Sequence, residues 1–175
     1  MLSVNLSAGQ LHEPQLAAEV AAVLEATGVA PGQLGLELTE SMLLAGAPHT
    51  FATLGRLRAL GVRLALDDFG TGYASFAALK RVPVDTLKLD RSFVAGLGRD
   101  PGDAAIVRAM VTMAHALGLG VTAEGVERAE QLAELRALGC DAGQGYYFAT
   151  PLASEAVGAL LGLPVPPWGS ADGRA

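Results

Sequence analysis

Two patterns of hydrophobic and polar residues alternate along the chain. Short aliphatic runs bounded by turn residues are typical of buried strands, and apolar residues at helical spacing are typical of amphipathic helices. The short runs predict strands over residues 2–6, 34–38, 62–66, 86–89, 121–123 and 141–148. The helical spacing predicts helices over residues 14–27, 48–60, 73–80, 104–117, 130–138 and 154–161.

Alternating strands and helices are typical of βα units and a parallel sheet, so the predicted fold class is α/β. Glycine follows several of the predicted helices, as in Gly28 and Gly118, and is a common residue at helix C-termini. The connections are short, so we expect one domain over residues 1–164. The Pro- and Gly-containing residues 165–175 are expected to form a flexible C-terminal tail.

Polar residues that can ligate a metal or hold a phosphate follow each predicted strand. The carboxyl ends of parallel strands meet on one side of a barrel, so these side chains are expected to share one site. They are carboxylates, amides and one ammonium, and oxygen ligands select hard cations such as Mg²⁺ or Mn²⁺. The candidates are Asn5, Glu37, Glu40, Asp67, Asp68, Lys88, Asp90, Glu124, Glu127 and Gln144.

Structural roles are the alternative for each of these residues taken singly. Asp67 and Asp68 could cap a helix or form a turn, and Glu40 and Glu127 could be caps or loop anchors. Lys88 is harder to explain in this way, because a buried lysine needs a partner. The repetition of polar residues at one end of the strands favours a shared site.

Composition narrows the classes of function. The chain has 12 Lys and Arg residues against 18 Asp and Glu residues, a formal charge of −6, so it lacks the basic surface of DNA-binding or anionic-membrane-binding proteins. The single cysteine, Cys140, excludes an internal disulfide and is expected to be a small buried residue. No apolar run is long enough to span a bilayer, so we expect a cytoplasmic protein, or the cytoplasmic part of a larger one, without membrane insertion.

Six short motifs in this order resemble those of the EAL domain family, the cyclic di-GMP phosphodiesterases, and they cover residues 2–152. They are Asn5-Leu6-Ser7, Glu37-Leu38-Thr39-Glu40, Asp67-Asp68-Phe69-Gly70-Thr71-Gly72-Tyr73, Leu87-Lys88-Leu89-Asp90-Arg91-Ser92-Phe93, Ala123-Glu124-Gly125-Val126-Glu127 and Gln144-Gly145-Tyr146-Tyr147-Phe148. The resemblance implies a TIM-type (βα) barrel, here incomplete, with about six of the eight βα units that close such a barrel.

The resemblance also implies a reaction and a set of site residues. The reaction would be hydrolysis of one phosphodiester of cyclic di-GMP to linear pGpG, with two Mg²⁺ or Mn²⁺ ions. Catalytic roles would fall to Lys88, Glu124 and Gln144, metal ligation to Asn5, Glu37, Asp67 and Asp68, and loop anchoring to Glu40 and Glu127. A homodimer, and upstream sensor or GGDEF-type domains in a longer parent protein, are the partners that the resemblance implies.

The sequence departs from the family pattern in one respect. The Glu-Ala-Leu triplet for which the family is named, and the Arg that follows it, do not occur before Asn5. Loss of an outer-shell metal partner commonly costs about 10- to 100-fold in activity, so loss of a metal-binding carboxylate should cost at least that much. Whether the chain is an enzyme is therefore open, and we expect it to be weakly active or inactive by itself.

Two alternatives to a phosphodiesterase follow. A non-catalytic EAL-like module could bind cyclic di-GMP or a protein partner. An unrelated doubly wound α/β nucleotide-binding protein would carry G-x-G-x-x-G after its first strand, but Ser7-Ala8-Gly9-Gln10 has one glycine there.

Overall fold

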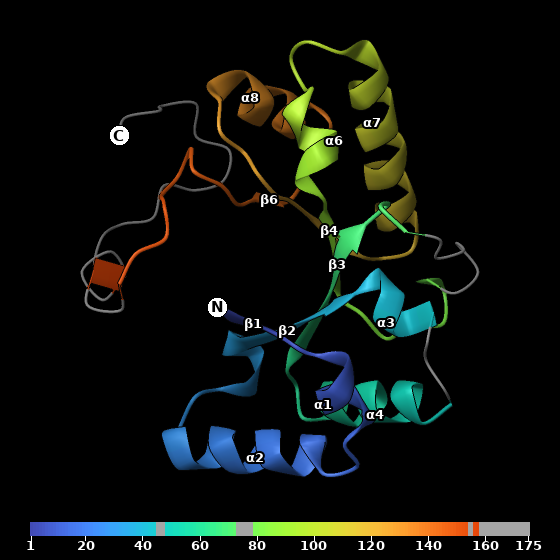
Figure 1. Cartoon of the computed structure of the whole chain (residues 1–175), viewed down its shortest axis with the longest axis vertical. Coiled ribbons are helices and arrows are strands. Elements are labelled where there is room, and N and C mark those ends of the chain that lie inside the picture. Colours follow the sequence, from blue (N-terminus) through green and yellow to red (C-terminus); the bar gives the residue numbers. More distant parts are fainter. Residues whose placement is uncertain (45–47, 73–78, 154–155, 158–175) are drawn as a thin grey trace.

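The structure is a computed structural model of the chain and describes residues 1–44, 48–72, 79–153 and 156–157. The described strands form one parallel sheet in the order β1-β2-β3-β4-β5-β6 (Figure 1). The strands are β1 (Leu2–Asn5), β2 (Leu34–Thr39), β3 (Arg63–Phe69), β4 (Thr86–Leu89), β5 (Gly120–Ala123) and β6 (Ala142–Gly143). Sequential order with all strands parallel confirms the predicted βα architecture.

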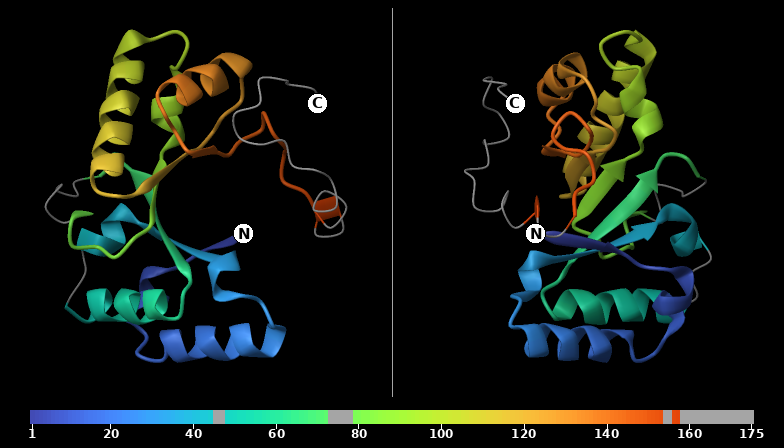
Figure 2. Two further views of the ribbon diagram at one scale, coloured as in Figure 1. Left: turned by 180° about the vertical axis from the view of Figure 1, so that it is seen from behind. Right: turned by 60° about the vertical axis from the view of Figure 1, so that its left-hand side comes forward.

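Helices connect successive strands. They are α1 (Ala8–His12), α2 (Leu16–Thr27), the 3₁₀ helix η1 (Pro31–Gln33), α3 (Glu40–Leu44), α4 (Pro48–Ala59), α6 (Arg91–Ala95), α7 (Pro101–Ala116) and α8 (Ala129–Ala137). In Figure 2 the sheet curls into an open arc, with α2 and α4 outside its first strands and α7 and α8 outside its last. Within the described residues β1 and β6 are the two edges of the sheet, so this part of the chain forms the expected incomplete barrel.

Alternation along the central strands separates the core from the candidate site. Leu36 and Leu38 of β2 are buried in the hydrophobic core, together with leucines of β3, β4 and the helix α4. Successive strand side chains point to opposite faces. Glu37 and Lys88, each flanked by two buried leucines, therefore point to the other face, the one that the helices do not cover.

Strand register brings the polar residues to the same level. Asn5 pairs with Glu37, and Thr39 pairs with Asp67. The register between β3 and β4 shifts between Leu66 and Phe69, at the two aspartates. Asp68 has a positive φ of 54°, a left-handed conformation that Asp tolerates better than most residues.

Several element boundaries differ from the prediction. The third strand runs through Asp67 and Asp68 to Phe69 instead of ending before them, because the bulge keeps the strand paired with β4. The sixth strand covers Ala142–Gly143 alone, because residues 144–148 turn back to pair with Val126. The helices α1, α3 and α6 were not predicted. Most residues of the helices expected over 73–80 and 154–161 lie outside the described residues, as does the expected tail 165–175.

Candidate functional site

Lys88 lies at the centre of the candidate site. Its Nζ is 2.5 Å from Glu37 Oε2, 2.6 Å from Glu124 Oε1 and 3.1 Å from Asp67 Oδ1. The Lys88 residue is 5% exposed and Glu37 is 8% exposed. The three carboxylates come from β2, from β3 and from the residue after β5, so the carboxyl ends of three strands meet at one ammonium group.

A second grouping shares two of these acids. Asp67, Asp68 and Glu124 each offer a carboxylate oxygen, and these oxygens all lie within 4.8 Å of one another. Asp67 Oδ1 also accepts a hydrogen bond of 3.1 Å from the Asp68 N–H. Close carboxylates that are poorly compensated by cations are a ready site for a hard metal ion.

The electrostatics of the site follow from this crowding. Burial lowers the pKa of Lys88, but its hydrogen bonds to Glu124, Glu37 and Asp67 outweigh burial and raise that pKa above its usual value. Burial raises the pKa of Glu124, against the opposing effect of Lys88. Burial, with the charges of Asp67 and Asp90, also raises the pKa of Asp68. The ammonium is therefore firmly protonated, whereas Glu124 accepts a proton more readily than an ordinary glutamate.

The remaining candidates surround this centre at different distances. Asn5 is exposed at the end of β1, next to Glu37 across the sheet. The backbone of Gln144 pairs with Ala123 and Val126, and its residue is exposed. These backbone bonds place Gln144 beside the loop that carries Glu124.

The two predicted loop anchors behave differently. Glu40 is 4% exposed, and its Oε2 accepts a hydrogen bond of 3.1 Å from the N–H of Gly70, in the loop after β3. Glu127 is exposed, and the hydrogen bond that the structure gives it is made by its backbone N–H, to Gln131. Glu40 thus contacts the loop directly with its side chain.

Two further residues, Asp90 and Cys140, have contacts typical of structural roles. Asp90 caps α6 by accepting the Ser92 N–H at 2.9 Å. Burial raises the pKa of Asp90, but its hydrogen bonds with Ser92 outweigh burial and lower that pKa. Cys140 is 4% exposed, which confirms the expectation of a small buried residue, and burial raises the pKa of its thiol to about 11.

Sequence reasoning missed Gln131, a residue of α8 that is 1% exposed. Its side chain binds backbone groups of two separate segments. The available signal was a glutamine at the third position of a helix, which is common in helix caps. That signal is weak here, because the residue at the N-cap position is Arg128 and not Ser or Thr.

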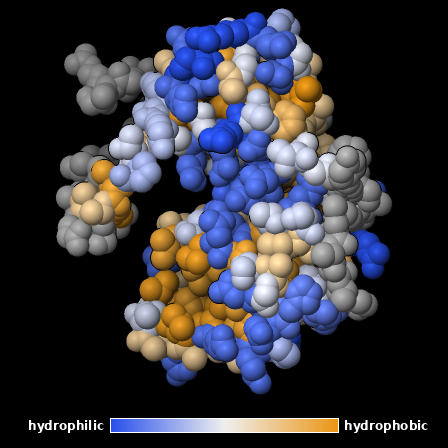
Figure 3. All heavy atoms as spheres, in the orientation of Figure 1, coloured by the Kyte–Doolittle hydropathy of each residue, from blue (hydrophilic) through white to orange (hydrophobic). Residues whose placement is uncertain are grey.

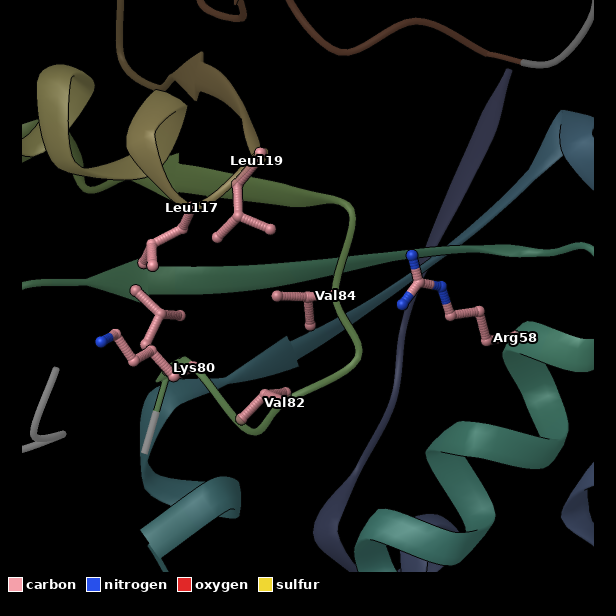
Figure 4. A pocket seen from close by; sticks show the side chains of 8 residues that line it. Arg58, Lys80, Val82, Val84, Leu117 and Leu119 are labelled. Atoms are coloured by element: carbon pink, nitrogen blue, oxygen red, sulfur yellow. The ribbon is translucent and has the colours of Figure 1, made fainter. Parts of the chain in front are cut away.

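A cavity of about 250 Å³ lies at the other end of the strands (Figure 4). Val84 and Leu119 precede β4 and β5, so the cavity faces the amino ends of these strands. It lies away from the carboxylates of Glu37, Asp67 and Glu124 at their carboxyl ends. No carboxylate lines it, and Figure 4 shows aliphatic side chains with two basic ones. Its lining residues are Arg58, Leu79, Lys80, Val82, Val84, Leu117, Gly118 and Leu119.

The surface view shows where apolar residues are exposed. Hydrophobic side chains gather around β1 and α2 in Figure 3, where Leu2 is 67%, Val4 is 44% and Val23 is 60% exposed. The described helices include none that is both long and apolar enough to cross a membrane.

Comparison with known proteins supports the resemblance found in the motifs. The model of the EAL domain family matches residues 1–151. The cyclic di-GMP phosphodiesterase NbdA of Pseudomonas aeruginosa is 45% identical over 160 residues, which are 91% of this chain and 20% of NbdA. The chain spans about a fifth of the length of the first curated relatives that it matches.

Solved structures agree with the sequence match. The PaMucR phosphodiesterase in complex with c-di-GMP has a TM-score of 0.82 and 41% identity, over 89% of this chain and 63% of PaMucR. BlrP1 of Klebsiella pneumoniae, in a manganese and cy-diGMP complex, has a TM-score of 0.78 and 34% identity, over 83% of this chain and 38% of BlrP1. The chain therefore belongs to the EAL domain family.

Proposed function

We propose that the chain is a cyclic di-GMP phosphodiesterase domain that hydrolyses one phosphodiester of its substrate to linear pGpG. The observation that supports this most directly is the cluster of Glu37, Asp67 and Glu124 around the buried Lys88, at the carboxyl ends of parallel strands. Ligand sites of (βα) barrels lie at this end. The proposed substrate, cyclic di-GMP, is taken from the names of the similar proteins NbdA and PaMucR.

The donor set fits hard divalent cations, Mg²⁺ or Mn²⁺. Carboxylate oxygens from three residues within 4.8 Å of one another are hard ligands with excess negative charge. Two ions would be held by Asn5, Glu37, Asp67 and Asp68. When bound, such a pair supplies Lewis acidity and an activated water for attack on phosphorus.

The protein's own residues would divide the remaining work. Lys88 stays protonated and has no proton-accepting capacity, so its Nζ would donate hydrogen bonds to the attacking water or a phosphate oxygen. Glu124 has a raised pKa and lies 2.6 Å from that Nζ, which suits a general base acting on the same water. Gln144 would position water from the adjacent loop.

Loop anchoring would keep the site assembled. Glu40 would hold the loop after β3 through its hydrogen bond to the Gly70 N–H, 3.1 Å long. Added bulk at Gly72 would meet the same carboxylate, because a Cβ there would lie 2.7 Å from Glu40 Oε1. Glu127 would act as a second anchor, through the loop that follows β5.

Hydrolysis of cyclic di-GMP by the 175-residue chain, with Mn²⁺ or Mg²⁺, tests this proposal. We expect weak turnover or none in the wild type, and any turnover should fall by at least about 100-fold in Asp67→Ala, because the substitution removes a proposed metal ligand. Asp100→Ala is the matched control, since it removes an aspartate that caps α7 instead. Measurable turnover in the wild type that is unchanged in Asp67→Ala would refute the two-metal assignment.

A binding module that senses cyclic di-GMP is the second candidate. It is favoured by the open side of the site, where Asn5 and the rest of β1 are exposed among the described residues. Calorimetric titration with cyclic di-GMP and Mg²⁺ tests it. Heat of binding without turnover would favour the module, and absence of heat at high micromolar nucleotide would remove it.

We also propose that the domain acts in the cytoplasm, as a homodimer and beside sensor or GGDEF-type domains of a longer protein. The relatives are about five times longer than the matched region, which supports additional domains. The exposed apolar residues of β1 offer a surface on which a further segment of that longer protein, or a second copy, could pack.

A further inference from the structure

The loop that carries Glu124 is held tightly against α6. The Glu124 N–H donates to Leu89 O at 3.1 Å, which ties the loop to the end of β4. A Cβ on Gly125 would lie 2.5 Å from the Cβ of Arg91, so the backbone of this loop packs directly on the first residue of α6. α6 begins a few residues after Lys88. The contact of the Glu124 loop with α6 therefore links the position of Glu124 to that of Lys88.

Gln131 joins the two segments at the far end of the loop. Its Oε1 accepts hydrogen bonds from the N–H groups of Glu127 and Arg128, both 2.9 Å long. Its Nε2 donates to Val94 O, in the last turn of α6, also at 2.9 Å. Gln131 is 1% exposed; its bond to Val94 is buried, and its two bonds to the loop are partly buried.

Arg128 reinforces the same connection from the surface. Its guanidinium donates to Ala95 O and to Leu97 O, each at 3.1 Å. These carbonyls lie at the C-terminal end of α6 and just beyond it, where the last carbonyls of a helix lack intrahelical partners. Two neighbouring side chains therefore bind the C-terminal part of α6 to the loop after β5.

We propose that Gln131 is a positioning residue that holds the Glu124 carboxylate close to Lys88 and to the carboxylates of Asp67 and Asp68. This inference rests on the proposed function, because the contacts of Gln131 are interpreted as support for the proposed catalytic site. Without Gln131, the Glu124 loop would keep its bond to Leu89 but lose its buried link to α6. The carboxylate of Glu124 would then sample positions away from Lys88 and Asp67.

Helix capping alone is the competing explanation. Gln131 is the third residue of α8 and accepts the N–H of the N-cap residue Arg128. Gln10 does the same in α1, where its Oε1 accepts the Ser7 N–H at 2.9 Å. Within the described part of the chain the Gln10 side chain bonds to Ser7 alone, so Gln10 provides a control of identical residue type and cap position.

The experiment compares Gln131→Met, Gln131→Glu and Gln10→Met in the 175-residue chain by titration with Mn²⁺ alone. Methionine retains side-chain volume and removes all three hydrogen bonds, so no large cavity is added. Loss of an outer-shell contact typically costs about 10- to 100-fold in metal affinity, and we expect about tenfold for Gln131→Met at unchanged stoichiometry. Gln131→Glu keeps the acceptor for both N–H groups but has no donor for Val94 O, so it separates capping from the link to α6 and should share the loss. Gln10→Met should bind like the wild type.

A crystal structure of Gln131→Met gives a readout that needs no metal. We expect the 2.6 Å contact between Lys88 Nζ and Glu124 Oε1 to be lost or divided among several positions. An unchanged contact together with wild-type Mn²⁺ affinity would overturn the proposal, as would an equal loss of affinity in Gln10→Met. A wild type that binds Mn²⁺ but does not hydrolyse cyclic di-GMP would reject the proposed function while leaving the Gln131 comparison valid. If the wild type binds no Mn²⁺, the crystal structure decides alone.

Discussion

At the scale of single residues, the candidate site is short of positive charge. Lys88 supplies one cation to Glu37, Asp67 and Glu124, and Asp68 adds a further carboxylate nearby. Burying charges costs free energy that pairing repays only in part. Burial is the main reason why the pKa of Glu124 and that of Asp68 are raised in the metal-free protein, and repulsion from the neighbouring acids adds to it.

The raised pKa of Glu124 predicts a pH dependence of stability in the metal-free protein. The usual value is 4.5, and the folded-state value lies above it. In the window between these values the folded state binds more protons than the unfolded state, so the free energy of unfolding falls as pH rises. Urea unfolding in the presence of a chelator, over a pH series from about 4.5 upward, should show this fall, and Glu124→Gln should reduce its slope.

The matched control for this measurement is Glu19→Gln, which alters an exposed glutamate on α2. It should keep the slope of the wild type. Parallel pH profiles for the wild type and Glu124→Gln would show that Glu124 does not cause the fall in stability.

The core of the site was predictable from sequence because one geometrical rule governs it. Parallel strands present their carboxyl ends on one side, and that rule brings Glu37, Asp67, Lys88 and Glu124 together. The rule does not say which acids contact Lys88, because this depends on register shifts such as the one between Leu66 and Phe69. Gln131 escaped prediction because its partners are backbone groups, which leave no trace in residue type.

At the scale of elements, long periodic segments were predicted well and short ones were not. The helix α2 ends at Thr27, and Gly28 follows with a left-handed φ of 69°, as its position in the sequence predicted. The helices α1, α3 and α6 have five residues each, too few to show an apolar period. The last strand was predicted too long, since residues 144–148 look like a strand in composition but are held by tertiary bonds to Val126.

Close packing of residues 144–148 against the Glu124 loop predicts a strong effect at Gly145. A Cβ on this residue would lie 2.2 Å from Val126 O and 2.3 Å from Val126 N, both rigid backbone atoms. Gly145→Ala should therefore displace one of the two segments and lower the free energy of unfolding by about 1–3 kcal/mol, the usual cost of overpacking. Urea denaturation measures the change.

Gly55→Ala tests whether the effect at Gly145 comes from this contact. Gly55 lies in α4, and a Cβ there would meet no atom within 4 Å. Alanine in a helix interior is better than glycine by about 0.5–1 kcal/mol, so this variant should be more stable than the wild type. Equal behaviour of the two alanine variants would contradict the packing explanation.

At the scale of the whole molecule, β1 is an edge strand of the curled sheet within the described residues. All four residues of β1 are exposed, and β2 is its partner on one side within the described part of the chain. Unpaired N–H and C=O groups on such an edge can pair with another strand. Apolar side chains beside it, including Leu2 and Val4, add a hydrophobic contribution to any such pairing.

This edge predicts self-association of the 175-residue chain that a single charge should weaken. Sedimentation velocity at increasing concentration should show growing complexes for the wild type, and Val4→Lys should shift the distribution towards monomer, because a lysine on an edge strand opposes pairing. Ile106→Lys is the control: Ile106 of α7 is 44% exposed, as Val4 is, but lies away from any strand edge. If both lysine variants dissociate equally, general hydrophobicity drives association. If Val4→Lys associates like the wild type, the edge of β1 is not the contact, and another surface of the domain must form the proposed homodimer.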